Sequence, residues 1–301
     1  MTIEEEWQEY FTGAAFKSAH TVKSYKNSHK RITDYVGKPI GKASVNELIA
    51  AVANLAENPN TQATLFNAIL VFRTIAGKDN DKIWAAKKAL QPEIEAWRGI
   101  VAHNKKQYLP TPAELKKHMN DQFYEENWRS YIINFLLINY NTRNADLNLE
   151  FVKSIHTTKA NKTKNYIVSR KNDYVYIRND YKTFSKYGQK RFIFKSVPFG
   201  RAVKYFEAQH APNERVYLLE NNGLPIEQSS IANYIKKYTY KNLTEGDYNK
   251  IAVSAITDIA DIKQLEQLGD RRGTDLKTLI TYYNIPYSEK TWGKYNNNED
   301  I

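Results

Sequence analysis

The sequence predicts a mainly α fold with a small β-sheet (α+β), in which an N-terminal helical bundle precedes a helical domain with an inserted three-stranded sheet. Apolar residues recur at helical spacing through the first hundred residues and again beyond Pro198. Between these regions, short β-like runs at 166–168, 174–178 and 191–195 predict the strands. The chain has 301 residues, 42% of them apolar and 13% aromatic, which suits one large or two ordinary folded domains.

The N-terminal domain, residues 1–103, is predicted to contain amphipathic helices packed into a bundle. Turn residues at 57–60 (Glu-Asn-Pro-Asn) separate the second helix from the third. The expected helices lie at about 21–36, 44–55, 61–75 and 81–97.

A linker is predicted at 104–110, followed by a second domain at 111–301. Thr111 and Glu114 form a capping box with Pro112 at the first helical position, so a helix is expected to start there. Further helices are expected at about 125–140, 198–209, 226–239, 245–262 and 273–283.

The composition excludes several kinds of chemistry. Cysteine is absent, which excludes disulfides, zinc–thiolate sites, iron–sulfur clusters and a cysteine nucleophile. The six histidines do not fall at metal-ligand spacing on one helix and no phosphate-binding loop motif occurs, so no metal and no cofactor are expected. The acidic N-terminus and the shortness of the apolar run at 131–138 predict a soluble intracellular protein of the cytoplasm or nucleus of a host, without a membrane segment.

The net charge of +11 is concentrated in one segment. Residues 153–204 hold 14 Lys and Arg but only 2 Asp and Glu, whereas 111–152 and 205–301 have an excess of acidic residues. A solvated lysine-rich face is one interpretation, but the interleaved aromatic residues indicate a folded element and favour binding to a nucleic-acid backbone. The residues expected to contact DNA are Lys162, Lys164, Arg170, Lys171, Lys186, Lys190 and Arg191.

Three segments have the form of motifs. Residues 136–147 (LLINYNTRNADL) combine an apolar helix with a Thr-x-Arg turn, an acidic residue and Leu. In the basic region, Tyr-Lys-Thr at 181–183 precedes Lys-Tyr-Gly at 186–188. Near the C-terminus, Leu-Gly at 268–269 is followed by Thr278 and by the pair Tyr282 and Tyr283.

In their order along nearly the whole chain, these parts resemble the tyrosine recombinases (phage-type integrases), especially divergent versions found in DNA viruses and mobile elements. The resemblance implies a DNA-clamp domain before the linker and a recombinase-like domain after it. Arg143 would be the first phosphate-clamping arginine. Lys182 would be the catalytic lysine, with Lys186 and Lys190 as substitutes. The nucleophile would be Tyr282 or Tyr283, and Tyr282 is slightly preferred because it follows Thr278 by four residues.

The sequence departs from the family at its second motif, which should read His-x-x-Arg. Asp-Tyr-Asn-Lys at 247–250 stands at that place, so that Lys250 would replace the second arginine. Asp270 stands where the family has a later His or Trp, and a carboxylate there would repel a negatively charged transition state. Arg271 or Arg272 could instead fill the vacated clamp position.

Two functions therefore compete. The first is a DNA strand-transferase with type IB-like chemistry, which cuts and rejoins double-stranded DNA through a 3′-phosphotyrosyl intermediate and self-associates on DNA. The second is a catalytically degenerate relative that binds DNA without cleaving it. A basic scaffold for RNA or acidic proteins is a third interpretation.

Affinity for duplex DNA should fall steeply as salt rises, because neutralising phosphates with Lys and Arg releases condensed counterions. Titrations of labelled duplex at low and moderate salt measure the effect. Weak binding that stays flat across this range would contradict the nucleic-acid interpretation.

Overall fold

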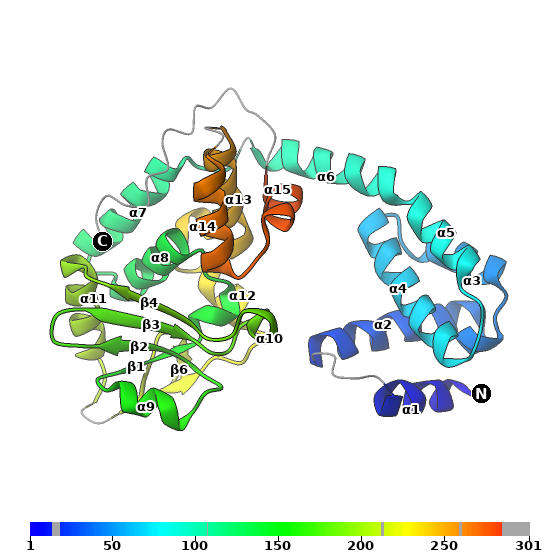
Figure 1. Ribbon diagram of the computed structural model, residues 1–301, viewed down its shortest axis with the longest axis horizontal. Helices are drawn as coiled ribbons and strands as arrows, with labels where there is room; N and C mark the ends of the chain where they lie inside the picture. Colours follow the sequence, from blue (N-terminus) through cyan, green and yellow to red (C-terminus); the bar gives the residue numbers. More distant parts are fainter. Residues whose placement is uncertain (14–18, 107, 212–213, 259–260, 285–301) are drawn as a thin grey trace. The chain divides into compact units, whose positions relative to one another are not determined.

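The computed structural model describes residues 1–13, 19–106, 108–211, 214–258 and 261–284. The chain forms two compact units, Met1–Asn104 and Lys105–Ile301. Helices dominate both units, and the second also carries a small sheet (Figure 1), so the predicted mainly α fold with a small β-sheet is confirmed.

The first unit is a helical bundle around a core of aliphatic and aromatic side chains. Ile32, Leu48, Ile69 and Phe72 are completely buried there. Its helices are α1 (Ile3–Gly13), α2 (Ala19–Val36), α3 (Val45–Leu55), α4 (Pro59–Ile75), α5 (Asp81–Ala89) and α6 (Gln91–Lys106), with a 3-10 turn η1 (Ile40–Lys42). The expected helix at 81–97 is thus two helices, and α6 continues through the first residues of the expected linker.

Helix α1 was not among the predicted helices, although Ile3, Trp7 and Tyr10 recur at helical spacing along it. Tyr10 is buried in the core of the bundle, and Trp7 packs against that core with its ring 5.3 Å from the ring of Phe72.

Glu6 gives α1 a second, polar attachment, because its side chain is completely buried. One carboxylate oxygen of Glu6 accepts a hydrogen bond from the Gly41 amide at 2.6 Å, and the other lies 3.0 Å from Nε2 of His29. Apolar packing and this buried carboxylate together attach α1 to the bundle.

The first helix of the second unit begins where the sequence predicts, whereas the helix expected at 226–239 is shortened to 231–236. Thr111 and Glu114 form the expected capping box, with Pro112 at the first helical position. The helices are α7 (Pro112–Tyr124), α8 (Trp128–Tyr140), α9 (Ile155–Ala160), α10 (Phe184–Tyr187), α11 (Val197–Glu207), α12 (Ile231–Lys236), α13 (Glu245–Asp258), α14 (Ile262–Arg272) and α15 (Leu276–Tyr283), with 3-10 turns η2 (Asn144–Leu147) and η3 (Tyr240–Asn242). Most of α14 falls in a stretch for which no helix was predicted.

The main sheet has five strands in the order β4-β3-β2-β1-β5. They are β1 (Leu149–Val152), β2 (Asn165–Ser169), β3 (Tyr174–Arg178), β4 (Lys190–Phe194) and β5 (Val216–Tyr217), and β6 (Glu220–Asn221) pairs separately with β7 (Leu224–Pro225). The three predicted strands are present as an antiparallel group. The sheet is larger than predicted because β1 joins β2 in parallel and β5 adds to β1; both are too short to give a clear pattern.

Aromatic packing fixes the sheet under α8 and α11 (Figure 1). The ring of Tyr140 lies 5.8 Å from that of Tyr176 on β3, and the rings of Phe135 and Phe199 are 4.7 Å apart. The opposite face carries Val168 and Val175 and packs against α9. The end of α8 is therefore held rigidly against the sheet.

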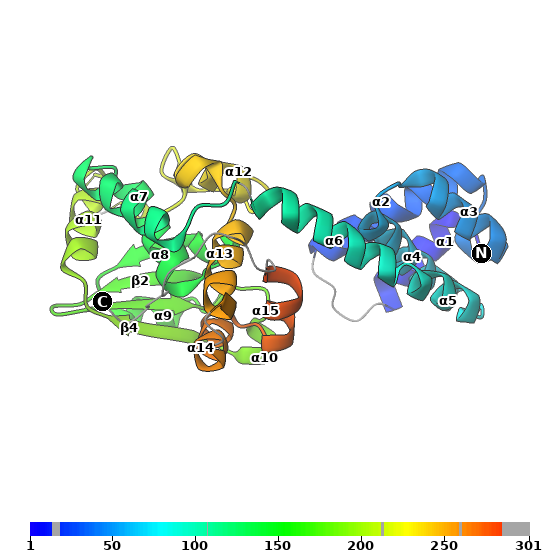
Figure 2. The ribbon, with the colours of Figure 1, turned by 90° about the horizontal axis from the view of Figure 1, so that it is seen from above.

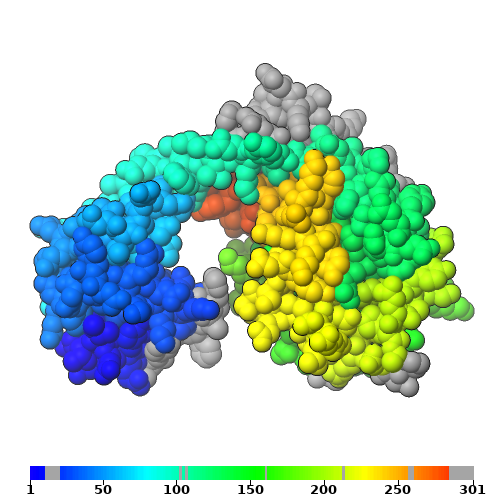
Figure 3. Space-filling view, turned by 180° about the vertical axis from the view of Figure 1, so that it is seen from behind, coloured from blue at the N-terminus to red at the C-terminus, as the bar shows by residue number. Residues whose placement is uncertain are grey.

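The C-terminal helices pack beside one another and against α8 (Figure 2). In the space-filling view, the segment from α12 to α13 lies beside α7 and α8 (Figure 3). The buried Asn134 explains part of this arrangement, because its amide donates to the Tyr238 carbonyl oxygen at 2.8 Å and its oxygen accepts from the Tyr248 hydroxyl. Among the described residues, no helix combines the length and apolarity needed to cross a membrane.

Gly269→Ala should destabilise the second unit by about 1–3 kcal/mol, since a Cβ there would lie 2.7 Å from the Thr274 carbonyl oxygen and overpack α14 against the next turn. Gly246→Ala is the matched control, because its Cβ would meet only Thr244 Oγ1 at 3.6 Å. Urea unfolding followed by circular dichroism measures both. Equal midpoints for the two variants would show that the close approach at Gly269 relaxes freely.

Candidate functional site

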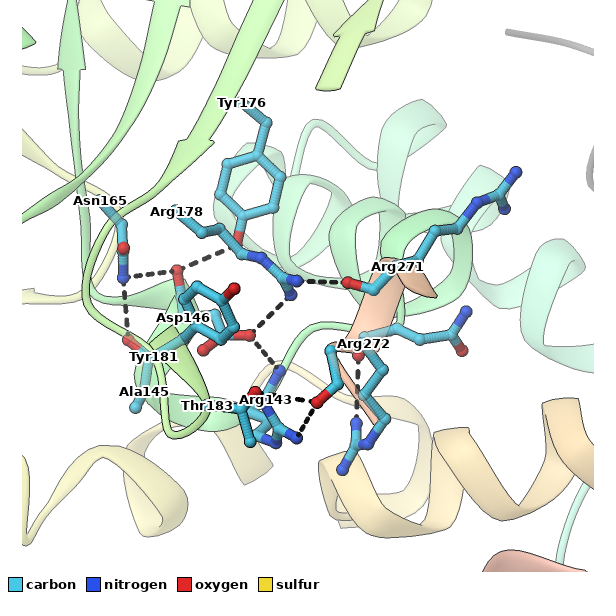
Figure 4. A network of polar contacts seen from close by, with 12 residues as sticks. Arg143, Ala145, Asp146, Asn165, Tyr176, Arg178, Tyr181, Thr183, Arg271 and Arg272 are labelled. Carbon is cyan, nitrogen blue, oxygen red and sulfur yellow. Dashed lines mark hydrogen bonds and ion pairs between the residues drawn. The ribbon is translucent and has the colours of Figure 1, made fainter. Parts of the chain in front are cut away.

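Four chain segments meet at one end of the main sheet. They are the turn η2 after α8, the end of β3, the loop that contains α10, and the C-terminal end of α14 with the residues just after it. Each brings a polar or charged side chain to the same place (Figure 4). This cluster is the candidate functional site.

An ion pair between Arg178 and Asp146 lies at the centre of the cluster. Nη1 of Arg178 donates to Oδ2 of Asp146 at 2.8 Å, and both side chains are 0% exposed. Nη2 of Arg178 donates to the carbonyl oxygen of Arg271 (Figure 4), and the guanidinium lies 5.0 Å from the ring of Tyr181. Arg178 therefore links β3 to η2 and to α14 at once.

Asp146 also fixes the backbone of Arg143. Its Oδ2 accepts a hydrogen bond from the Arg143 amide at 3.0 Å, as a cap on the η2 turn. Burial raises the pKa of Asp146, while the Arg178 guanidinium and this backbone hydrogen bond act in the opposite direction. The carboxylate is thus committed to Arg178 and to the main chain of Arg143.

The side chain of Arg143 points at the turn after α14. Its Nη2 donates to Thr274 Oγ1 at 3.0 Å and to the Gly273 carbonyl oxygen at 3.4 Å, whereas its buried Nη1 has no hydrogen-bond partner among the described residues. Burial and the neighbouring Arg272 lower the pKa of Arg143. Arg143 consequently retains a donor that an anion could use.

Arg272 is the third arginine of the cluster and is only 1% exposed. Its Nη1 donates to the Asn141 carbonyl oxygen at 3.1 Å, and its Nη2 donates to Glu245 Oε1 at 3.0 Å and to the Tyr283 hydroxyl at 3.2 Å. Burial acts to lower the pKa of Arg272, but Glu245 and Tyr283 together raise it. A tyrosine hydroxyl and a fixed cation therefore lie in direct contact.

The two candidate tyrosines occupy different environments. Tyr283 is half-buried with its ring 5.0 Å from the Arg272 guanidinium. Tyr282, one residue earlier on α15, is 54% exposed. The cluster therefore contains the hydroxyl of Tyr283, although the sequence slightly favoured Tyr282.

The loop with Lys182 docks on Gly273. Thr183 Oγ1 donates to the Gly273 carbonyl oxygen at 2.8 Å, and Tyr181 donates to the Gly188 carbonyl oxygen at 2.6 Å. Gly273 has φ +68°, and a Cβ there would lie 2.8 Å from Thr183 Oγ1. Lys182 is exposed between two anchored neighbours, beside the turn that follows Arg272.

The substitute lysines lie on the same loop and on β4. Nζ of Lys190 pairs with the carboxylate of Asp270 and lies 5.5 Å from the ring of Tyr187. Lys186 is exposed, with Nζ 5.1 Å from the same ring. The ammonium group of Lys190 therefore neutralises the charge of Asp270, the residue that stands where the resemblance would imply His or Trp.

Two other predicted residues are directed away from the cluster. Lys250 follows Glu245 by five residues, which places it about 140° around α13. It lies near Lys105, whose Nζ pairs with Asp247 at 2.8 Å, and burial together with Lys105 lowers the pKa of Lys250. The side chain of Arg271 donates to the Asn139 carbonyl oxygen at 3.2 Å. Among Lys250, Arg271 and Arg272, the candidates for the second clamp position, Arg272 is the one that contacts both Glu245 and Tyr283.

The residues predicted to bind DNA are divided between the two ends of the sheet. Lys162 and Lys164 precede β2 at the end that holds the cluster. Arg170 and Lys171 lie in the turn between β2 and β3 at the other end, about 16 Å away along a five-residue strand.

Lys164 pairs with Glu150 at 3.8 Å and Arg170 pairs with Asp173, while Lys162, Lys171 and Arg191 are exposed. The basic segment therefore does not form one patch.

Sequence reasoning missed the roles of Arg178 and Glu245. A signal existed for Arg178, because a charged residue ends a strand whose other positions are apolar or aromatic. Glu245 gave no comparable signal, since an acidic residue in the first turn of a helix is common. Among the described residues, no group of three or more His, Asp or Glu side chains could hold a metal ion.

Comparisons with known proteins give likenesses among solved structures alone. No protein-family model matches the chain, and no curated protein matches it. Among solved structures, the chain is similar to one described as the crystal structure of XerA recombinase, with 15% sequence identity and a TM-score of 0.34. The alignment covers 95% of this chain and 93% of that chain.

Asp146→Asn should destabilise the second unit by about 3–5 kcal/mol, because it leaves the charge of Arg178 buried without a counter-ion. Asp173→Asn, which breaks the pair with Arg170 at the surface, should lower the free energy of unfolding far less, because solvent screens that pair. Denaturant unfolding measures both variants. If Asp146→Asn lowers the free energy of unfolding no more than Asp173→Asn does, the buried pair is not an important contribution to stability.

Proposed function

We propose that the chain is a DNA-binding protein of tyrosine-recombinase type that cuts and rejoins double-stranded DNA through a phosphotyrosyl link. One observation carries the proposal: the Tyr283 hydroxyl lies 3.2 Å from Nη2 of the buried Arg272, in the same cluster as Arg143. A phenol held against one arginine, in a cluster that contains a second arginine with an unpartnered donor among the described residues and an exposed lysine loop, suits attack on a phosphodiester.

The chemistry requires fixed positive charge. When a phenol oxygen attacks a phosphodiester, the pentacoordinate transition state carries additional negative charge on its oxygens. Guanidinium groups that are already oriented stabilise this charge without reorganisation. Arg143 offers its unpaired Nη1, and Arg272 lies beside the attacking oxygen.

In the proposed step, the oxygen of Tyr283 forms a bond to phosphorus and the bond from phosphorus to the 5′ oxygen breaks. Lys182 gives a proton to that leaving oxygen. The reverse step rejoins the strand with no net oxidation or reduction, and it needs no cofactor. Tyr283 replaces Tyr282 as the preferred nucleophile because its hydroxyl lies against Arg272.

DNA contacts are proposed at both ends of the main sheet. Lys162, Lys186 and Lys182 would bind phosphates near the cluster, and Arg170 with Lys171 would bind the backbone farther away. We propose that the N-terminal domain, residues 1–103, forms the other part of a DNA clamp across the linker at 104–110. Self-association on DNA belongs to the same proposal.

A second candidate function is DNA binding without cleavage. It is favoured by Asp270 and by the position of Lys250, which leave the cluster without two of the family's charge-stabilising groups. Loss of one such donor commonly lowers a rate by about 10²–10³. In this alternative, the same cationic cluster serves only to hold a phosphate.

A nicked suicide duplex should trap a covalent adduct of the wild-type protein that resists boiling in detergent. Tyr283→Phe should abolish the adduct because it removes the attacking oxygen, and Tyr282→Phe should retain it. Gel shifts of labelled duplex measure binding for each variant in parallel.

Three outcomes separate the candidates. Duplex binding without any adduct favours the non-cleaving alternative. Adduct formation that Tyr282→Phe alone abolishes would overturn the assignment of Tyr283. Neither binding nor adduct would reject both functions.

A further inference from the structure

Several polar groups of the cluster lack a hydrogen-bond partner among the described residues, and two of them belong to side chains that contact Arg272. Oε2 of Glu245 is buried, and no described residue donates to it. The Tyr283 hydroxyl accepts from Arg272, and no described contact takes its own hydrogen. One group is an acceptor without a donor, and the other is a donor without an acceptor.

The two groups meet at a single nitrogen. Nη2 of Arg272 lies 3.0 Å from Glu245 Oε1 and 3.2 Å from the Tyr283 oxygen. Because they share this donor, the carboxylate and the phenol both lie next to Nη2, and proton transfer requires a rotation of the carboxylate that brings Oε2 against the phenol. Arg272 would remain hydrogen-bonded to both side chains during that rotation.

The other carboxylates near the cluster are paired with other cations. Oδ2 of Asp146 accepts from Arg178 and from the Arg143 amide, while its buried Oδ1 has no hydrogen-bond partner among the described residues. Asp270 is 71% exposed and pairs with Lys190. The histidine that the family motif would supply is absent, since no histidine follows His210 in the chain.

We infer that Glu245 is the proton acceptor for Tyr283, an inference that rests on the proposed strand cleavage. As the Tyr283 oxygen bonds to phosphorus, its O–H bond breaks and the proton passes to Oε2 of Glu245. The 5′ oxygen leaves with a proton from Lys182. On rejoining, the phenol oxygen regains its proton from Glu245 and Lys182 regains its own.

The surroundings of Glu245 suit this role. It is the first residue of α13, where the positive end of the helix favours an ionised carboxylate before the reaction. After the proton moves, Glu245 is neutral and no longer balances Arg272. The guanidinium then has its positive charge available for the phosphate, at the stage when negative charge develops there.

Single-turnover cleavage of the suicide duplex by Glu245→Gln tests the inference across acidic, neutral and alkaline pH. The amide oxygen can still accept from Arg272, but it cannot take a proton. At neutral pH the variant should be slower by about 10²–10⁴-fold. The defect should shrink as pH rises, because hydroxide then removes the phenolic proton. Glu266→Gln, which removes an exposed charge on α14, should match the wild type.

A constant defect at every pH would overturn the inference and leave Glu245 as a counter-ion of Arg272. No adduct from the wild type would overturn strand cleavage itself, and the role of Glu245 with it. If Glu245→Gln loses duplex affinity, Glu245→Asp replaces it in the test. That variant retains a carboxylate and should give a slower reaction with the pH profile of the wild type; a rate that rises continuously with hydroxide would contradict the inference.

Discussion

The buried ion pair between Arg178 and Asp146 is the interaction on which the geometry of the candidate site depends. Two charges removed from water are costly to hold, and they persist only when each has well-oriented partners. Here the partners are the Arg143 amide and the Arg271 carbonyl oxygen, which belong to segments far apart in sequence. The pair therefore converts a sheet end, a turn and a helix end into one rigid unit.

This arrangement explains how several guanidinium groups can lie close together without an anionic ligand. Asp146 neutralises Arg178, and Glu245 neutralises Arg272. Arg143 has no carboxylate against its guanidinium, and its lowered pKa reflects burial and the nearby Arg272. A bound phosphate would therefore meet the guanidinium of Arg143, which has no carboxylate partner among the described residues. It would also meet the guanidinium of Arg272, whose partner Glu245 is the proposed proton acceptor.

Local signals in the sequence predicted much of the fold. The capping boxes at Ser44 and Thr111, and the apolar spacing of α2 and α4, depend only on neighbouring residues. The short strands β1 and β5 depend on contacts with distant segments, so periodicity could not reveal them. For the same reason the motif around Arg143 could be recognised, whereas the choice between Lys250, Arg271 and Arg272 depended on helix rotation and tertiary packing.

Gly273 limits how the chain can vary during evolution. Its carbonyl oxygen accepts hydrogen bonds from Arg143 and Thr183, its φ of +68° suits only glycine well, and no space is left for a side chain. A charged side chain on the surface of a protein can often be exchanged for another of similar charge. Gly273 cannot be replaced in this way, because its carbonyl contacts, its positive φ and the lack of space for a side chain all constrain the same position. In divergent descendants of this protein, the glycine should therefore persist longer than the charged residues that surround it.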